Sequence, residues 1–221
     1  MNIMKEPWDS FRKEHYRNLG ETVAKRCSEK GFIGHYAEDA TQALQLVLDL
    51  IPDGAKVGVP GSVTIREIGA FDALERKGCT VVQHWDPSLT TSVAKAERLR
   101  EEFLCDVLLS STNALTHDGT LVNIDGTGNR VAAMAWGTSK VILVAGINKI
   151  ARNMEQALVK IRDWATPINA LRLAMDIPCA KVGYCVDCNH PQRACRAVLT
   201  MERAPFGREI HVIIVGEHLG F

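Results

Sequence analysis

Apolar residues along the chain follow two different spacings. Short runs rich in valine, isoleucine and leucine recur between longer stretches in which an apolar residue returns every three or four positions. The short runs predict buried strands, and the longer stretches predict amphipathic helices. Continuous apolar strands separated by helices are typical of a largely parallel sheet that is covered on both faces. We therefore expect a three-layer α/β/α fold with a mostly parallel sheet.

Glycine, proline and polar residues divide the chain into a series of elements. Helices are expected over residues 8–30, 39–51, 64–78, 90–103, 128–137, 153–165 and 168–176. Strands are expected over residues 56–60, 79–85, 106–110, 120–125, 140–147 and 208–221. No repeat or low-complexity linker interrupts the series. We expect one domain over residues 1–221, with an irregular cysteine-rich segment at 178–196 before the last strand.

The balance of charge excludes some classes of partner. The 221 residues include 26 basic and 26 acidic side chains, so the formal net charge is zero. Proteins that bind nucleic acids or anionic membranes usually carry a basic excess, and neither partner is expected here. Residues 1–20 lack the apolar core of a signal peptide, and the apolar run 141–144 is far too short to cross a bilayer. We expect a cytoplasmic protein whose thiols stay reduced.

The first candidate site follows the strand expected at 56–60. Gly61 permits a tight turn, and Ser62 and Thr64 open the next helix. Thr64 and Glu67 have the spacing of a capping box, in which each side chain accepts a hydrogen bond from the other residue's backbone N–H. A strand, a glycine and a helix start in this order also present backbone N–H groups to a phosphate or carboxylate. The alternative is a plain helix cap without a ligand.

The second candidate site is the polar segment 111–130, which follows the strand expected at 106–110. This is the end of a parallel sheet at which ligands bind. The residues of interest are Asn113, Thr116, Asp118, Asp125, Gly126, Gly128, Asn129 and Arg130. The pattern G-x-G-x-x-G does not follow the first strand, so no dinucleotide site is expected. The alternative to a ligand site is a hairpin and turn whose polar side chains bind only their own backbone.

The third candidate site is the sequence PCAKVGYCVDCNHPQRAC, residues 178–195. Its four cysteines are Cys179, Cys185, Cys188 and Cys195. Structural zinc sites usually combine two short-spaced cysteine pairs, and only Cys185 and Cys188 have that spacing. Iron–sulfur clusters accept less regular spacing. The pattern favours a [4Fe–4S] cluster, with zinc or a thiol–disulfide switch as the alternatives.

These segments together resemble the LUD domain of lactate-utilization proteins, in particular short single-domain members of the LutC/YkgG-like type. The resemblance is carried by VPGSVTIREIG, SSTNALTHDGTLVNIDGTGNRVAAMAWG, KVILVAGINKI, PCAKVGYCVDCNHPQRAC and VIIVGEHLGF. It implies a fold similar to the NagB/RpiA/CoA-transferase group, with ligand sites at the carboxyl ends of the strands. It also implies a role beside iron–sulfur partner subunits in the conversion of lactate to pyruvate. The cysteine segment resembles that of a subset of stand-alone members, which implies a cluster bound by this chain itself.

Three functions are compatible with these sites. In the first, which we expect, a [4Fe–4S] cluster lies beside a pocket for a small hydroxy or keto acid. The protein is then an iron–sulfur oxidoreductase subunit or a lyase-type enzyme with a redox protein as partner. In the second, it is a phosphosugar isomerase or CoA-transferase-like enzyme with structural zinc, and Asp118, Asp125 or Glu67 is the general base. In the third, it is a non-catalytic redox sensor or accessory subunit. A homodimer is expected only by analogy.

Overall fold

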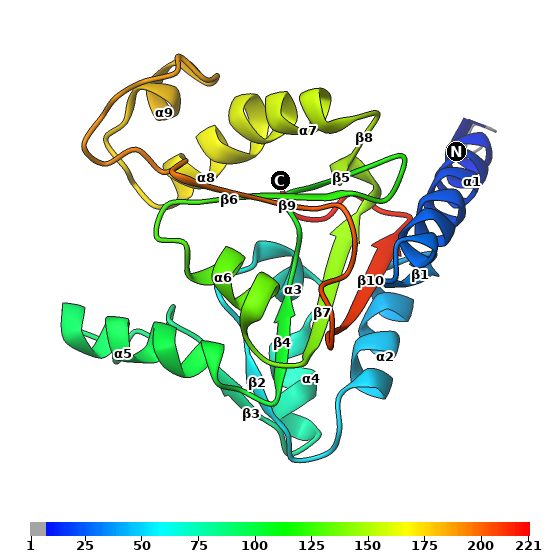
Figure 1. The fold of residues 1–221 in the computed structure, drawn as a ribbon, viewed down its shortest axis with the longest axis horizontal. Coiled ribbons are helices and arrows are strands. Elements are labelled where there is room, and N and C mark those ends of the chain that lie inside the picture. Colours follow the sequence, from blue (N-terminus) through cyan, green and yellow to red (C-terminus); the bar gives the residue numbers. More distant parts are fainter. Residues whose placement is uncertain (1–7) are drawn as a thin grey trace, which may run out of the picture.

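The computed structural model describes residues 8–221 and contains a central sheet of six strands (Figure 1). Across the sheet, the strands are β1 (Ile33–Ala37), β10 (Glu209–Val215), β7 (Lys140–Gly146), β4 (Val107–Ser110), β2 (Lys56–Gly58) and β3 (Thr80–Val82). Every neighbouring pair is parallel. The predicted parallel sheet is confirmed, and the carboxyl ends of its strands meet along one edge. Residues 1–7, which begin the N-terminal stretch expected to lack a signal peptide, lie outside the described residues.

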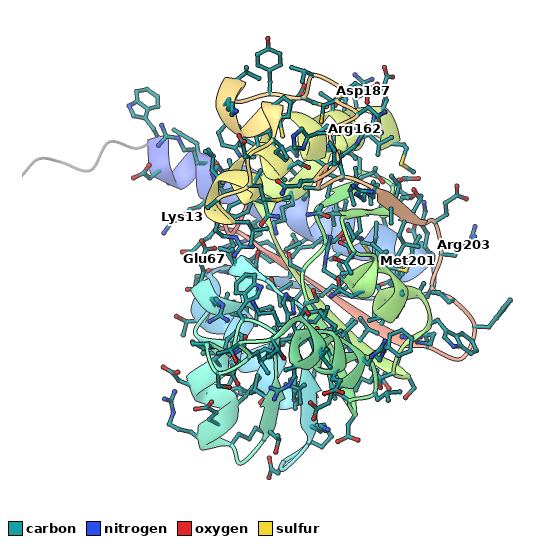
Figure 2. All side chains as sticks on the ribbon, turned by 90° about the vertical axis from the view of Figure 1, so that its left-hand side faces the viewer. Lys13, Glu67, Arg162, Asp187, Met201 and Arg203 are labelled. Atoms are coloured by element: carbon teal, nitrogen blue, oxygen red, sulfur yellow. The ribbon has the colours of Figure 1, made fainter. Side chains whose placement is uncertain are left out.

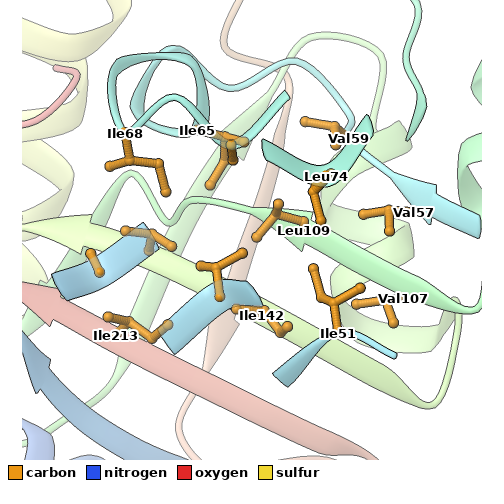
Figure 3. Packing of buried hydrophobic residues seen from close by; sticks show 14 of the residues in the cluster. Ile51, Val57, Val59, Ile65, Ile68, Leu74, Val107, Leu109, Ile142 and Ile213 are labelled. Carbon is orange, nitrogen blue, oxygen red and sulfur yellow. The ribbon is translucent and has the colours of Figure 1, made fainter. Parts of the chain in front are cut away.

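Three helices cover one face of the central sheet. They are α2 (Ala40–Leu50), α3 (Val63–Glu67) and α4 (Ala70–Arg76). Ile65 and Leu74 from these helices lie in one fully buried cluster with Leu109 and Ile142 from the strands (Figure 3). Burying an aliphatic side chain of this size contributes roughly 1.5–3 kcal/mol, so the cluster holds this layer on the sheet.

The opposite face is covered by α1 (Trp8–Glu29), by α6 (Asn129–Trp136) and by the end of α5 (Ser92–Phe103). α1 packs very closely on β1. A Cβ atom on Gly34 would lie 1.9 Å from the carbonyl oxygen of Ala24, so only glycine permits this packing. With helices on both faces of a parallel sheet, the predicted three-layer α/β/α architecture is confirmed.

A second sheet of four strands lies on the α1 side of the central sheet and was not expected (Figure 1). Its strands, in order, are β8 (Ile150–Ala151), β5 (Ala114–Thr116), β6 (Leu121–Asp125) and β9 (Ala197–Met201). β6 pairs antiparallel with both β5 and β9. One face packs towards the central sheet, and α7 (Met154–Lys160) with the π-helical turn Ile161–Ala165 covers the other. The polar segment 111–130 is therefore largely a β-hairpin.

Other boundaries differ from the sequence prediction for local reasons. The expected helix 64–78 is two helices, because Gly69 between them takes a positive φ of 72°. After the π-helical turn, α8 (Thr166–Arg172) includes Pro167 in its first turn, where the missing N–H costs nothing. A short helix, α9 (Pro178–Val182), opens the cysteine-rich segment. Among the described residues, no helix combines the length and apolarity needed to cross a membrane.

Candidate functional site

A cavity of about 730 Å³ opens at the carboxyl ends of the parallel strands. Its walls come from the segments that follow β2, β3, β4, β6 and β7, and from residues 220–221 after β10. Loops from several strands converge at this edge of an open parallel sheet, which is why ligands bind there. The first two candidate sites both contribute to this one cavity.

The end of the cysteine-rich segment forms another wall, made by residues 191–194 and 196. The backbone N–H of Arg196 donates to the carbonyl oxygen of Asp125 at 2.8 Å. A Cβ atom on Gly126 would lie 3.0 Å from the carbonyl oxygen of Ala194, so the two segments are in close contact. Figure 1 shows the segment running from α9 back along β6 as β9. The third candidate site therefore adjoins the other two.

Most of the predicted substrate-binding and catalytic residues line the cavity. They are Gly61, Ser62, Thr64, Asn113, Asp125, Gly126, Asn129 and Arg130. The predicted residues that do not line it are Glu67, Thr116, Asp118 and Gly128. Gly128 instead precedes α6 with a positive φ of 88°, a backbone role that favours glycine.

The capping box predicted at the start of α3 is wrong. Ser62 is the N-cap, and its hydroxyl accepts a hydrogen bond from the Ile65 N–H at 3.3 Å. Glu67 points instead to the C-terminal segment, where its Oε2 accepts from the Gly220 N–H at 2.6 Å. Glu67 and Asp187 of the cysteine-rich segment are well separated in Figure 2. Because Ser62 rather than Thr64 caps α3, the Thr64 hydroxyl is available to face the cavity.

Arg130 lies at the centre of a dense hydrogen-bond network. Its Nε and Nη2 donate to Asp125 Oδ1 at 3.0 and 2.6 Å. Its Nη groups also donate to Asn113 Oδ1 at 2.6 Å and Asn123 Oδ1 at 2.8 Å, and to the carbonyl oxygens of residues 111 and 124. The two side chains of the ion pair are 12% and 8% exposed. The guanidinium thus has protein acceptors on every nitrogen, and its main role here is to fix the hairpin and the start of α6.

Asp118 lies in the turn of the β5–β6 hairpin, away from the cavity. Its carboxylate binds the Lys30 ammonium at 2.7 Å and the Thr116 hydroxyl, and these two contacts hold the pKa of Asp118 well below its usual range. A carboxylate whose pKa is lowered in this way is a weak base, which does not suit the general-base role considered for Asp118. The structure therefore gives Asp118 and Thr116 the turn-stabilising role that was the alternative interpretation of this segment.

Sequence reasoning missed Lys149, which follows β7 and lines the cavity. The residue is 4% exposed, and its Nζ donates to Thr64 Oγ1 at 2.9 Å and to Ser111 Oγ at 2.7 Å. Burial and the nearby charge of Arg130 lower the pKa of Lys149 to about 7. The one sequence signal is a lone lysine directly after a fully apolar strand. A buried amine with this pKa suits nucleophilic or proton-transfer chemistry.

Sequence reasoning also missed a histidine–carboxylate pair. His84 lines the cavity, and its Nδ1 lies 2.8 Å from Oε1 of Glu102, a residue of α5 that is 0% exposed. Burial raises the pKa of Glu102, while the contact with His84 lowers it. A buried carboxylate fixes the orientation of its partner imidazole, which here leaves His84 Nε2 as the free ring nitrogen. The pair supplies the cavity with an oriented proton carrier.

The cavity carries an excess of positive charge. Within the described residues, its cationic lining side chains are Arg130, Lys149, Arg172, Arg193 and Arg196, and Asp125 is the one lining carboxylate side chain. Asp125 is already paired with Arg130. Arg172 stacks on the ring of Trp85, with its guanidinium carbon 4.2 Å from the ring centroid. The arrangement favours a small anionic ligand, because opposite charges attract strongly in a partly closed site.

The four cysteines of the segment lie within range of one another's charge. Burial, and then the charges of Cys188, Cys195 and Cys185, raise the pKa of the Cys179 thiol. Across residues 8–221, no three cysteine, histidine, aspartate or glutamate side chains meet closely enough to hold a metal ion. The thiols are therefore neighbours whose sulfur atoms do not converge on one centre in this structure.

Hydrogen-bond donors surround these thiols. The Asp187 backbone N–H donates to Cys185 Sγ at 3.4 Å, and the Arg193 Nε–H donates to Cys195 Sγ at 3.2 Å. The Arg193 Nη1 also donates to the Cys188 carbonyl oxygen at 2.6 Å. Hydrogen bonds of this kind orient side chains that ligate metals. Arg193 also lines the cavity, so one side chain touches both the thiols and the ligand site.

Comparison with known protein families identifies the family of this chain. The family model for the LUD domain matches residues 20–215. The chain belongs to the LUD-domain family. The match spans the central sheet, the second sheet and the cysteine-rich segment of this LUD domain. A comparison with curated proteins finds no match.

A solved structure supports the fold. This LUD domain is similar to a DUF162 family protein from Deinococcus radiodurans, with a TM-score of 0.50 and 13% sequence identity. The similarity covers 90% of this chain and 98% of the other. At this level of identity the likeness concerns the fold alone.

Proposed function

We propose that this LUD domain binds a small organic acid in the cavity and takes part in the redox metabolism of that acid, with an iron–sulfur cluster on the cysteine-rich segment. The observation that carries the proposal is the shared wall: residues 191–194 and 196 line the cavity, and they belong to the same segment as the four cysteines. A cofactor on that segment lies beside any ligand in the cavity.

The charge of the cavity supports an acidic ligand. Arg172 and Arg196 line it from different segments, and neither has a carboxylate partner among the described residues. A carboxylate bound between such groups forms charge-assisted hydrogen bonds. His84 and Lys149 then lie in the same cavity and supply proton carriers, which the interconversion of a hydroxy acid and a keto acid needs.

The four thiol ligands of the cysteine segment, and the N–H groups beside them, suit an iron–sulfur cluster. Cys179, Cys185, Cys188 and Cys195 would hold it, and the N–H donors on Cys185 and Cys195 match the hydrogen bonds that tune such clusters. Because the sulfur atoms do not yet converge, metal binding requires the cysteine side chains to rotate towards one another. A bound cluster would supply one-electron transfer.

The redox balance of the proposal needs a partner. Oxidation of a 2-hydroxy acid to a 2-oxo acid removes two electrons and two protons. A one-electron cluster would pass these electrons on singly, so two equivalents of a one-electron carrier protein are the proposed acceptor, one for each electron. Within the cavity, His84 and Lys149 are the residues placed to take the protons.

Arg172→Met tests the acid site. We expect the affinity for a small 2-hydroxy or 2-oxo acid to fall roughly 10- to 100-fold, because one charge-assisted hydrogen bond is lost. Isothermal titration calorimetry with lactate and pyruvate measures it. Arg66→Met is the matched control, since Arg66 stacks on the same Trp85 ring at 4.6 Å but does not line the cavity. Equal losses in both variants would contradict a direct role for Arg172.

Anaerobic purification tests the metal site. We expect brown protein with iron and acid-labile sulfide in equal amounts, and loss of both in the variant with all four segment cysteines changed to serine. Cys79→Ser is the control, because Cys79 is buried far from the segment in sequence and bonds the Pro52 carbonyl. Full retention of iron in each single cysteine variant would refute ligation by these residues.

A second candidate function is favoured by Lys149 and the His84–Glu102 pair, which suit proton transfer without any redox step. In it, the protein is a phosphosugar isomerase or CoA-transferase-like enzyme, and the cysteines hold structural zinc. Colourless protein with one tightly bound zinc, stabilised against heat by a sugar phosphate, would favour this candidate over the first.

A further inference from the structure

The side-chain amine of Lys149 lies in an unusual place for a lysine. It lines the cavity, and both hydrogen-bond partners of its Nζ, Thr64 Oγ1 and Ser111 Oγ, are uncharged hydroxyls. Within the described residues, no carboxylate lies within ion-pair distance of this amine. Buried lysines are normally paired with an acid. A lysine kept buried without one indicates a role for the neutral amine.

The local hydrogen bonds accommodate the neutral form. The Ser111 hydroxyl donates to the Thr112 carbonyl oxygen at 3.2 Å, so Ser111 Oγ accepts from Lys149. The Thr64 hydroxyl is not needed by the α3 cap, so its oxygen is available as the second acceptor. A neutral amine keeps two N–H groups, one for each of these hydroxyl oxygens, and its lone pair stays free. Gly220 closes the site from the C-terminal side, where a Cβ atom would lie 2.5 Å from Thr64 Oγ1 and 3.2 Å from Lys149 Nζ.

Burial and the charge of Arg130 also favour the neutral amine. Together, burial as the largest cause and then Arg130, opposed by Glu67, lower the pKa of Lys149 to about 7. A desolvated lysine beside another cation is the environment that activates lysine as a nucleophile towards carbonyl compounds. The geometry and the charges therefore agree.

We propose that the amine of Lys149 attacks the carbonyl carbon of a 2-oxo acid held in the cavity and forms an imine. The inference rests on the proposed function, because it assumes that the cavity holds an organic acid. The carboxylate would bind the cavity arginines, and its 2-oxo group would face Lys149. The nitrogen forms a bond to carbon 2, the former carbonyl oxygen leaves as water with the two amine protons, and no electrons are transferred overall. His84 lies in the same cavity as a proton donor for the leaving oxygen.

Borohydride trapping tests the inference. The protein is incubated with pyruvate and sodium borohydride, digested, and mapped by mass spectrometry. Hydride adds to the imine carbon, so we expect Lys149 to gain the mass of pyruvate less one oxygen atom. Lactate, which lacks the carbonyl group, should give no adduct. The yield should rise with pH through about 7, where the Lys149 amine becomes neutral, whereas an ordinary lysine would respond nearer to pH 10.

Two variants and one control complete the test. Lys149→Met and Lys149→Arg should lose at least nine-tenths of the adduct. Lys160→Met should keep it, because Lys160 is also partly buried, with its ammonium on the Asn148 carbonyl oxygen, but does not line the cavity. An adduct that persists in the Lys149 variants overturns the inference.

Calorimetry on the same samples separates the inference from the proposed function. Pyruvate that binds without an adduct overturns imine formation and leaves the acid site in place. If neither pyruvate nor lactate binds and no adduct forms, the proposed acid site is wrong, and the imine with it. Imine formation needs no metal, so protein prepared without iron should still form the adduct, and failure of the metal proposal alone does not affect this result.

Discussion

Arg130→Met is expected to lower the free energy of unfolding by about 3–5 kcal/mol, the usual cost of breaking a buried ion pair from one side. Methionine leaves the Asp125 carboxylate buried without its ion-pair partner, and it removes one of the two donors to each of the Asn113 and Asn123 amide oxygens. Those residues connect β4, the second sheet and α6. Urea denaturation followed by circular dichroism measures the loss.

Arg203→Met is the control for this measurement. Arg203 is exposed after β9 (Figure 2), so its replacement should change the free energy of unfolding by less than about 0.5 kcal/mol. Arg130→Lys should recover only part of the loss, because an ammonium cannot reproduce the planar set of guanidinium donors. Wild-type stability in Arg130→Met, combined with lost acid binding, would contradict the structural role and assign Arg130 to the ligand.

The sequence predicted five of the six strands of the central sheet, all except β1, because the signals of those five strands are local. β4, β7 and β10 are short apolar runs in which every residue or nearly every residue is buried, and such runs identify parallel strands directly. Their position also predicted where the cavity opens, because the carboxyl ends of parallel strands meet at one edge. Predictions that need only the pattern along the chain were therefore confirmed.

The second sheet depends on pairing between distant segments, and the sequence did not predict it. β9 joins β6 although the two strands are separated by the whole of α6, β7 and the following helices. The burial of β9 is irregular along its length, so it lacks the clear alternation of a predicted strand. Without β9, the sequence could not show that the cysteine-rich segment returns to the cavity.

Sequence reasoning missed Lys149 and His84 because their environments also depend on contacts between distant segments. Lys149 is buried because Thr64, Ser111 and Gly220, from three distant segments, close around it. His84 and Glu102 meet only because β3 and α5 are neighbours in the fold. By contrast, the sequence made Asp118 a candidate general base, yet its carboxylate is paired with Lys30 from α1. Contacts between residues distant in sequence determine how buried an ionisable side chain is and which charges lie beside it. Those two factors set its pKa and therefore its chemical role.

Lys149→Met is expected to raise the free energy of unfolding at pH 7 by about 2–3 kcal/mol, the reverse of most core substitutions. The pKa of Lys149 falls from 10.5 to about 7 on folding, and each pKa unit corresponds to about 1.4 kcal/mol, so holding the amine in this site costs roughly 5 kcal/mol. Methionine removes that cost and loses two hydrogen bonds worth about 1 kcal/mol each. The remaining hydroxyls of Thr64 and Ser111 line the cavity, where water reaches them. Urea denaturation across a pH series measures the gain.

The pH dependence identifies the cause of this gain. Below about pH 7 Lys149 is protonated in both states and the full penalty is present. Between about pH 7 and 10.5 the unfolded chain binds the extra proton, so the wild type gains stability as the pH rises. The advantage of Lys149→Met should therefore shrink towards pH 10, while Lys160→Met shows a smaller change of the same sign, because burial lowers its pKa as well. A gain that is independent of pH would contradict desolvation of the amine as the cause. A residue that destabilises the fold in this way is retained for its chemistry, which is the role that imine formation gives to Lys149.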